Sequence, residues 1–189
     1  AAINTKTNVG VICPLLYRPN GDIEYCCARR NCSSICLSLA FSYIFARIYR
    51  KMIADSYILL NEPDLLKKPC FEIDLPSGSC MLMDKSVITQ VGGFDNNTFL
   101  YYEENILFEK FKKLQLKNYI VPSVSCIHVG GSTTNSTKSA LFLKRCNYDS
   151  LIYYLKTYRN ISFIMLFYIH LSAKIRLSKM RLNKLFKRI

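Results

Sequence analysis

Short apolar runs separated by turn residues recur over the first 130 positions of the chain. Residues 9–16 are apolar and rich in β-branched side chains, and a Pro-Asn-Gly-Asp sequence at 19–22 follows them. This pattern predicts a strand and a tight turn. Residues 71–75 alternate apolar with acidic positions, as a half-buried strand does, and residues 80–83 continue as a second short strand.

Proline and glycine divide the rest of this region. Residues 119–121 and 124–128 predict two short strands broken at Pro122, which has no N–H group to offer a ladder. Asp84 suits the N-cap of a helix over residues 85–91, and the Gly-Gly pair that follows would end that helix.

Two longer segments have helical periodicity. Residues 103–116 place apolar side chains on one face and lysines outside it. Residues 35–53 are apolar on most sides and end in Arg47, Arg50 and Lys51, where cations suit the helix dipole. Strands and helices alternate without an internal repeat or a low-complexity linker, so the sequence predicts an α/β fold.

The positive charge is concentrated at the C-terminal end. Residues 150–189 carry nine Lys or Arg and no Asp or Glu, so they contribute +9 to the net charge of +13 and the first 149 residues only +4. An apolar arc of a helical wheel holds Leu171, Ile175, Leu182, Leu185, Phe186 and Ile189. Residues 161–173 are almost wholly apolar but fall short of the ~20 residues needed to span a bilayer.

We therefore expect residues 150–189 to be a basic, amphipathic, helical tail that lies on an anionic membrane surface. Binding to nucleic acid is the alternative for the tail alone. The apolar run and the lack of an RNA or DNA motif argue against it, so the sequence predicts no nucleic-acid partner.

The nine cysteines are odd in number and irregular in spacing. Cys13, Cys36, Cys80 and Cys126 lie in apolar runs, where a reduced thiol packs as a small hydrophobe. With no signal-peptide pattern in the sequence, we expect reduced thiols and a cytoplasmic location.

Four short motifs follow one another between residues 77 and 133. They are Ser77-Gly78-Ser79-Cys80, Gly92-Gly93-Phe94-Asp95, Tyr101-Tyr102-Glu103-Glu104 and Ile127-His128-Val129-Gly130-Gly131-Ser132-Thr133. Each alone is a weak signal. In this order and spacing they resemble the acceptor half of an inverting family-2 glycosyltransferase with a GT-A fold, similar to the bacterial rhamnosyltransferases.

The resemblance implies roles for the acidic pair. Glu104 would be the base that takes the proton from the acceptor hydroxyl, and its place at a helix N-terminus helps to keep it ionised. Glu103 points about 100° away around the helix and would orient the acceptor or a loop. The alternative is that both carboxylates only interact favourably with the helix dipole.

The same resemblance implies the walls of a substrate pocket. Small residues would form its floor and aromatic residues would line its acceptor side. The floor residues are Ser77, Gly78 and Ser79, and the acceptor-side residues are Phe94 and Asp95 with Phe99, Tyr101 and Tyr102. Aromatic rings stack on sugar faces, but they also fill cores, and the sequence leaves both uses open for each ring.

His128 would help to bind a divalent cation, Mn²⁺ or Mg²⁺. Imidazole suits these ions less well than carboxylate does, so His128 would supplement an Asp-x-Asp motif, and the chain contains none. The alternative is a histidine at a strand end that is hydrogen-bonded to backbone.

We expect residues 1–149 to be the acceptor-side part of a GT-A domain that lacks its nucleotide-binding half, as in the C-terminal portion of a longer enzyme or a truncated copy. The implied activity transfers a sugar, with inversion, from a nucleotide-sugar donor to a lipid-linked or cell-surface glycan at the cytoplasmic face of a bacterial membrane. The alternative is a non-catalytic, membrane-associated binding module or an inactive remnant.

Overall fold

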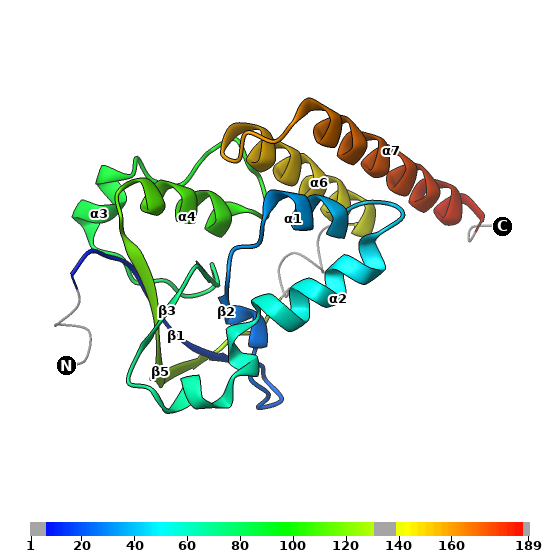
Figure 1. The fold of residues 1–189 in the computed structure, drawn as a ribbon. Helices are drawn as coiled ribbons and strands as arrows, with labels where there is room; N and C mark the ends of the chain where they lie inside the picture. Colours follow the sequence, from blue (N-terminus) through cyan, green and yellow to red (C-terminus); the bar gives the residue numbers. More distant parts are fainter. Residues whose placement is uncertain (1–6, 131–138, 187–189) are drawn as a thin grey trace. The chain divides into compact units, whose positions relative to one another are not determined.

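The chain forms two compact units, each assembled from three separate segments. A computed structural model describes residues 7–130 and 139–186 (Figure 1). Unit 1 contains Ala1–Asn31, Asp55–Asp95 and Glu103–Gly130, and unit 2 contains Cys32–Ala54, Asn96–Tyr102 and Gly131–Ile189. The protein is of mixed α/β type, as the sequence predicts, with the sheets in unit 1 and long helices in unit 2.

Unit 1 is built on a three-stranded sheet of order β1-β5-β3. The central strand β5 (Lys117–Ile127) is parallel to β1 (Val9–Tyr17) and antiparallel to β3 (Phe71–Ile73). Buried Asn118 ties the three together, because its Oδ1 accepts from Val11 N at 3.1 Å and its Nδ2 donates to Asp74 O at 2.8 Å. A buried polar side chain satisfied in this way fixes which residues pair.

Two helices complete unit 1 beside the sheet. They are α3 (Lys85–Gln90) and α4 (Glu103–Lys113), and Phe111 of α4 packs on Val11 of β1 in the core. Asp84 caps α3 by accepting from Ser86 N at 2.7 Å, which confirms the predicted cap. Gly92 and Gly93 both have positive φ values, of 72° and 69°, so glycine suits the stop after α3.

Several short elements connect the sheet of unit 1. The strands β2 (Ala28–Arg29) and β4 (Leu75–Pro76) pair antiparallel as a second sheet. The described part of unit 1 also contains three short 3₁₀ helices, η1 (Tyr25–Cys27), η2 (Leu59–Asn61) and η3 (Pro63–Lys67). Leu59 and Leu60 of η2 are buried in the same core as Leu15, Leu16 and Ile120.

Two strand predictions were wrong in unit 1. Residues 80–83 are not a strand, since only Leu82 forms an isolated bridge, to Ile12. Pro122 does not end a strand either, because β5 runs through it. The pairing instead shifts register there, from Pro14 opposite Val121 to Leu15 opposite Ser125, which accommodates the missing donor in an irregularity.

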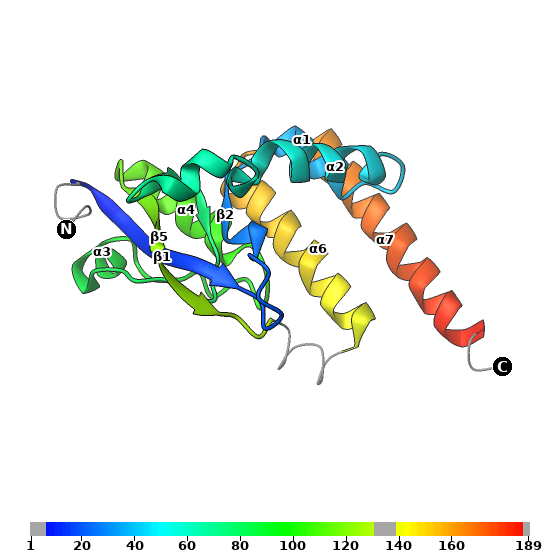
Figure 2. The same cartoon turned by 90° about the horizontal axis from the view of Figure 1, so that it is seen from below.

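Unit 2 is helical. It contains α1 (Ser34–Ala40), the first part of α2 (Ala46–Tyr57), α6 (Ala140–Thr157) and α7 (Phe163–Phe186). The helices α6 and α7 run side by side in both ribbon views (Figure 2), and Tyr148, Leu151, Tyr154, Leu155 and Ile169 are fully buried on them. The predicted division after residue 149 falls inside α6, and a separate role for residues 150–189 stays a prediction.

The single helix predicted over residues 35–53 was wrong. Two helices replace it, because buried Ser42 interrupts the segment and its hydroxyl accepts from Phe45 N at 2.7 Å. A serine that caps backbone N–H groups in this way favours a helix start over a helix interior.

The two units differ sharply in charge. Unit 2 holds 15 Lys and Arg residues and one acid, Asp149, so its net charge is +14, whereas unit 1 holds 11 basic and 12 acidic residues and has a net charge of −1. The excess of positive charge is therefore not confined to the C-terminal tail, residues 150–189, in which the sequence pattern placed it. It extends to the basic residues of α2 and α6.

The apolar arc predicted for the tail is exposed on α7. Leu171, Ile175, Leu182 and Phe186 are all exposed, while Ile169 and Ala173 are buried. The side chain of Leu185 and residue Ile189 lie outside the described part. No described helix is long and apolar enough to cross a bilayer.

The cysteines are free thiols, and their burial varies. Cys13 and Cys36 are buried as predicted, but Cys80 is exposed because the segment around it is not a strand. Burial raises the pKa of Cys13 to about 12 and that of Cys27 to about 11. These two thiols therefore stay protonated at neutral pH and behave as small apolar side chains.

Replacing Phe111 by Ala is expected to lower the free energy of unfolding by about 3 to 5 kcal/mol, because its ring is 0% exposed against Val11 and Leu107. Leu114→Ala is the matched control, since Leu114 follows the same helix but is exposed. Urea denaturation of both variants measures the difference. Equal losses of unfolding free energy in the two variants would contradict the placement of Phe111 in the core of unit 1.

Candidate functional site

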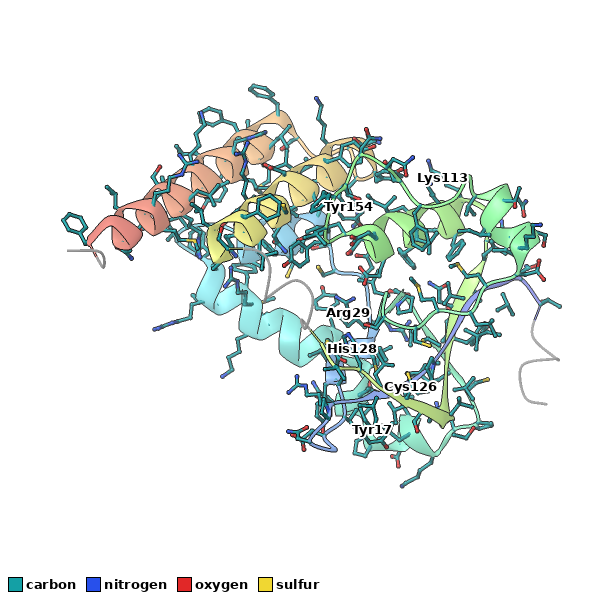
Figure 3. All side chains as sticks on the ribbon, turned by 180° about the vertical axis from the view of Figure 1, so that it is seen from behind. Tyr17, Arg29, Lys113, Cys126, His128 and Tyr154 are labelled. Atoms are coloured by element: carbon teal, nitrogen blue, oxygen red, sulfur yellow. The ribbon has the colours of Figure 1, made fainter. Side chains whose placement is uncertain are left out.

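The adjacent ends of β1 and β5 position the first two residues of the site. Glu24 N donates to Leu16 O at 2.8 Å, and His128 N donates to Tyr17 O at 2.8 Å. Parallel pairing brings these strand ends to the same edge of the sheet, where Figure 3 shows His128 and Cys126 beside Tyr17. Two residues 104 positions apart are thus anchored on consecutive carbonyl groups.

A tight turn returns the chain to this edge after β1. Arg18 N donates to Asp22 O at 2.8 Å, and Gly21, with φ of 85°, donates to Arg18 O at 2.9 Å. Asn20 Nδ2 donates to Asp22 Oδ2 at 2.8 Å, which holds the turn closed. This is the turn that the Pro-Asn-Gly-Asp sequence predicts, and it aims Glu24 back toward β5.

Glu24 and His128 form a close polar pair. His128 Nδ1 lies 2.6 Å from Glu24 Oε2, and the two side chains are 30% and 15% exposed. A carboxylate accepts only, so Nδ1 carries a proton and donates. This assigns the Nδ1–H form to a neutral His128 and leaves Nε2 as an acceptor. Ser79 Oγ lies 3.1 Å from Nε2 and 3.4 Å from Nδ1.

The segment Ser77-Gly78-Ser79 joins this pair to Glu104. Ser79 Oγ lies 2.9 Å from Ser77 Oγ, and between them Gly78 N donates to Glu104 Oε1 at 2.9 Å. A side chain at position 78 would place its Cβ 3.0 Å from that same oxygen, so glycine permits the close approach. Glu104 therefore has one carboxylate oxygen fixed by backbone.

The N-terminus of α4 positions Glu104. Glu103 and Glu104 both lie in the first turn, where the helix dipole stabilises negative charge. The next residue, Asn105, is buried, and its Nδ2 donates to Asn31 Oδ1 at 3.3 Å. Asn31 in turn donates to Glu109 Oε1 at 3.1 Å. These contacts fix the first turns of α4 within unit 1.

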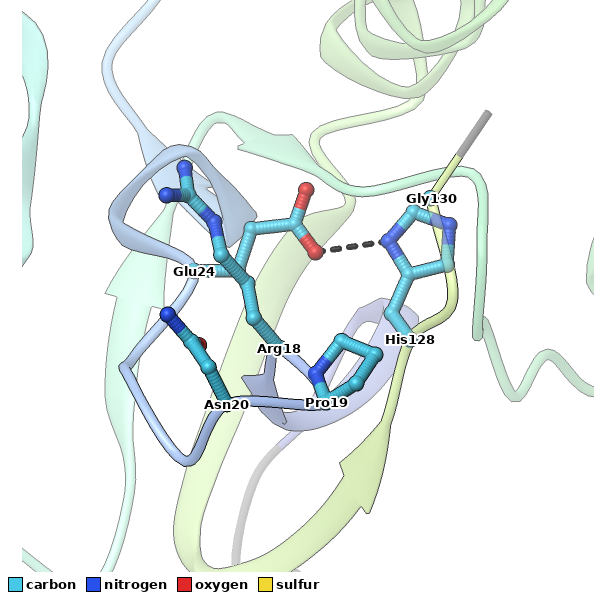
Figure 4. Close-up of a pocket in the computed structure, with 6 residues that line it drawn as sticks. All are labelled: Arg18, Pro19, Asn20, Glu24, His128 and Gly130. Carbon is cyan, nitrogen blue, oxygen red and sulfur yellow. Dashed lines mark hydrogen bonds and ion pairs between the residues drawn. The ribbon is translucent and has the colours of Figure 1, made fainter. Parts of the chain in front are cut away.

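A pocket of about 330 Å³ opens beside the Glu24–His128 pair. Figure 4 shows Glu24 and His128 on its wall with their contact dashed, and the turn residues around them. Its lining consists of Arg18, Pro19, Asn20, Glu24, His128 and Gly130. The size suits a sugar or part of a nucleotide, and the wall offers one cation, one carboxylate and one imidazole.

The metal role of His128 stays a prediction. Within residues 7–130 and 139–186, no three His, Cys, Asp or Glu side chains gather into a metal-binding group. His128 nevertheless has the arrangement common in metal ligands, in which a carboxylate accepts from one ring nitrogen and orients the other. It can supply one ligand atom, Nε2.

The structure brings together part of the predicted site. Ser77, Gly78, Ser79, Glu104 and His128 form one network through the contacts above. Phe94 is exposed, and Asp95 follows it in the connection between α3 and α4.

The two predicted tyrosines belong to unit 2. Tyr101 is exposed with a φ of 71°. Tyr102 is buried and stacks on Tyr154 with ring centroids 5.7 Å apart, so its ring fills the core of that unit. Ser132 and Thr133 of the fourth motif lie outside the described residues.

The sequence gives no signal for Arg18, Asn20 or Glu24. Glu24 follows a turn by two residues and resembles any surface glutamate there. Its role depends on the pairing of β1 with β5, over 100 residues apart in the chain. Only a contact between distant segments could have identified it.

Comparison with known proteins finds one local similarity. The chain is 40% identical over 52 residues to the N-acetylglucosaminyl-diphospho-decaprenol L-rhamnosyltransferase of Mycobacterium tuberculosis, strains CDC 1551 / Oshkosh and ATCC 25618 / H37Rv. The match covers 28% of this chain and 17% of the relative. No family model matches the chain, and no solved structure matches it. The similarity is to a glycosyltransferase, over a short segment.

The tautomer of His128 is a direct test of the site. At about pH 9, above the ordinary range for histidine, long-range ¹H–¹⁵N spectra are expected to show a protonated Nδ1 on His128. Glu24→Ala should shift His128 toward the Nε2–H form. The chain has two histidines, so exposed His170 is an internal control. An unchanged His128 spectrum in Glu24→Ala would refute the pair.

Proposed function

We propose that this chain carries the acceptor side of an inverting glycosyltransferase of GT-A type, with Glu104 as the base. One observation carries the proposal: the Glu104 carboxylate sits in the first turn of α4, with Oε1 held by Gly78 N–H at 2.9 Å. The local similarity to a rhamnosyltransferase and the order of the four motifs support the same reading.

The geometry suits proton abstraction. The acceptor hydroxyl gives its proton to Glu104 as its oxygen bonds to the anomeric carbon of the donor sugar. The bond from that carbon to the nucleoside diphosphate breaks on the opposite face, so the configuration inverts. Gly78 N–H donates to one carboxylate oxygen of Glu104, and the α4 N-terminus places partial positive charge beside it.

The neighbouring residues would bind the sugars. Ser77 and Ser79 offer two hydroxyl groups to a sugar beside Glu104, which Gly78 N–H contacts. Exposed Phe94 is available to stack on an acceptor, and Asp95 and Glu103 would accept hydrogen bonds from its hydroxyl groups. Buried Tyr102 would hold its segment in place rather than touch substrate.

A divalent cation, Mn²⁺ or Mg²⁺, would be held in part by His128. Glu24 orients the ring so that Nε2 is the ligand atom, and the remaining ligands would come from an Asp-x-Asp motif outside this chain. The bound cation would stabilise the negative charge of the leaving diphosphate. Arg18, on the wall of the same pocket, offers a further positive charge.

The relative's name suggests the class of substrates. We propose that a nucleotide-activated sugar such as L-rhamnose is the donor and that a sugar on a lipid diphosphate is the acceptor. The chain spans only 17% of that relative in the match, so the substrates of the whole protein stay a proposal.

Membrane association would suit such an acceptor. Phe163 and Ile164, at the start of α7, are 80% and 81% exposed, and Phe167 follows them one turn later, also exposed. Exposed aromatic and aliphatic side chains beside a basic helix are typical of a surface that inserts into a membrane interface. We propose that unit 2 lies on the cytoplasmic face of a bacterial membrane.

Glu104→Gln is expected to lower sugar transfer roughly 10²- to 10⁴-fold, because Gln cannot accept the proton. The assay uses a protein that joins this chain to a nucleotide-binding half, and calorimetry should show unchanged donor binding. Glu103→Gln, one residue away in the same helix turn, is the matched control and should lose much less. Wild-type turnover by Glu104→Gln would remove Glu104 from the role of base. A joined protein that binds donor yet transfers nothing before mutation would favour a binding module.

Phe163→Ser with Ile164→Ser is expected to weaken binding to phosphatidylglycerol vesicles roughly tenfold per side chain, through lost apolar burial. The control double variant, Leu82→Ser with Val124→Ser, removes two side chains of unit 1 that are 68% and 57% exposed. Sedimentation with vesicles measures both. Equal binding by the two variants would argue against insertion of α7.

A further inference from the structure

Two cations of unit 2 lie over one pair of aromatic rings, Phe41 and Tyr148, and a third cation is near them. Lys144 Nζ of α6 lies 5.4 Å from the ring centre of Phe41 and 5.3 Å from that of Tyr148. The guanidinium of Arg50, from α2, lies 5.6 Å from the same Phe41 ring. Arg176 of α7 is close enough to act on Lys144 electrostatically. We call Arg50, Lys144 and Arg176 the cation cluster.

Backbone carbonyl groups just after α1 hold the cluster in place. Arg50 Nε donates to Ala40 O at 3.0 Å, and Arg176 Nη2 donates to Ser42 O at 2.7 Å. Between them, Tyr148 OH donates to Phe41 O at 3.0 Å. Each arginine is therefore fixed through one nitrogen of its guanidinium group. The cluster is built into the fold rather than spread along flexible side chains.

No carboxylate balances this charge. Asp149 is the one acid in the sequence of unit 2, and it lies 3.6 Å from Arg145. None of the three cations forms an ion pair with a carboxylate within the described ranges. Positive charges gathered without an acidic partner repel one another, and that repulsion lowers stability unless an anion offsets it.

Two further features show that the cluster is electrostatically unsatisfied. Burial, followed by the charges of Arg50 and Arg176, lowers the pKa of Lys144 to about 8. Arg176 Nε is buried and has no hydrogen-bond partner among the residues described. Contact with aromatic rings compensates a cation only in part. The arrangement costs stability as it stands, and it would gain from a bound anion.

We propose that Arg50, Lys144 and Arg176 form a binding site for the phosphate group of a lipid. A phosphate presents several acceptor oxygens and up to two negative charges, which match two guanidinium groups and one ammonium group.

The surroundings favour a phosphate that is attached to a lipid. Tyr43, Ile44 and Phe45 are exposed and continue directly from the carbonyl groups that hold the cluster, and Ile48 of α2 is exposed as well. A soluble anion would bury none of these apolar side chains, whereas a lipid places its hydrocarbon chains beside its phosphate and can bury them. Lipid headgroups and lipid-linked diphosphates share this chemistry.

Phosphate binding can be tested with the whole chain and two lysine variants. Lys144→Gln removes the central charge, and Lys179→Gln removes an equal charge from an exposed position of α7. We expect Lys144→Gln to weaken binding to vesicles that contain phosphatidic acid roughly tenfold or more, the value of one charge-assisted hydrogen bond. Lys179→Gln should lose much less, as expected for a screened surface charge. Lys144→Arg keeps the charge and should retain binding.

Soluble diphosphate, measured by calorimetry, identifies the source of the phosphate. Competition by diphosphate against the vesicles would support a site that recognises the headgroup itself. Diphosphate binding lost in Lys144→Gln, without a difference on vesicles, would overturn the lipid assignment in favour of a soluble phosphate. Equal losses for Lys144→Gln and Lys179→Gln in both measurements would overturn the site altogether.

Circular dichroism shows whether Lys144→Gln remains folded, which is expected because the change relieves repulsion. Should this variant unfold, Arg176→Gln gives the same comparison against Lys179→Gln. The result is independent of the proposed transferase activity, since phosphate binding needs neither Glu104 nor a donor. A failed transfer assay with intact phosphate binding would leave this site standing.

Discussion

The parallel pairing of β1 with β5 is the constraint on which the candidate site depends. It places the carbonyl groups of Leu16 and Tyr17 side by side, and these two groups anchor Glu24 and His128. Side chains alternate between the faces of a strand, so a slip of one residue would turn His128 away from Glu24. Buried Asn118 opposes such a slip, because it bonds to Val11 and to Asp74 O at once.

The two halves of the site are positioned by different physics. Glu24 and His128 depend on backbone pairing at a sheet edge, whereas Glu104 depends on a helix N-terminus and on one glycine N–H group. The hydroxyl groups of Ser77 and Ser79 connect them, with Ser79 in contact with His128. A substrate that engages these hydroxyl groups would therefore affect both a proton acceptor and a metal-ligand candidate.

The sequence predicted what local chemistry determines. Asp84 as a cap and the glycine stop after α3 both follow from residue types at short spacing. The roles of Glu104 and His128 come from the resemblance of the motif order and stay predictions. Prediction from the sequence failed where contacts between distant segments determine the structure. Pro122 is accommodated because β1 pairs with an irregular β5, and Glu24 acquires its role only through His128. The helix break at Ser42 was local, but the apolar run around it concealed the cap.

The high positive charge of unit 2 opposes its stability. A net charge of +14 with a single acid produces strong self-repulsion, and half-buried Lys144 between two arginines bears its cost directly. A fold that needed only to be soluble could spread or pair these charges, as unit 1 does with 11 basic and 12 acidic residues. Unpaired cations fixed by backbone beside exposed apolar side chains are stabilised together by one kind of surface, which is anionic and apolar. The proposed transfer chemistry belongs to unit 1, and the proposed contact with a lipid surface belongs to unit 2.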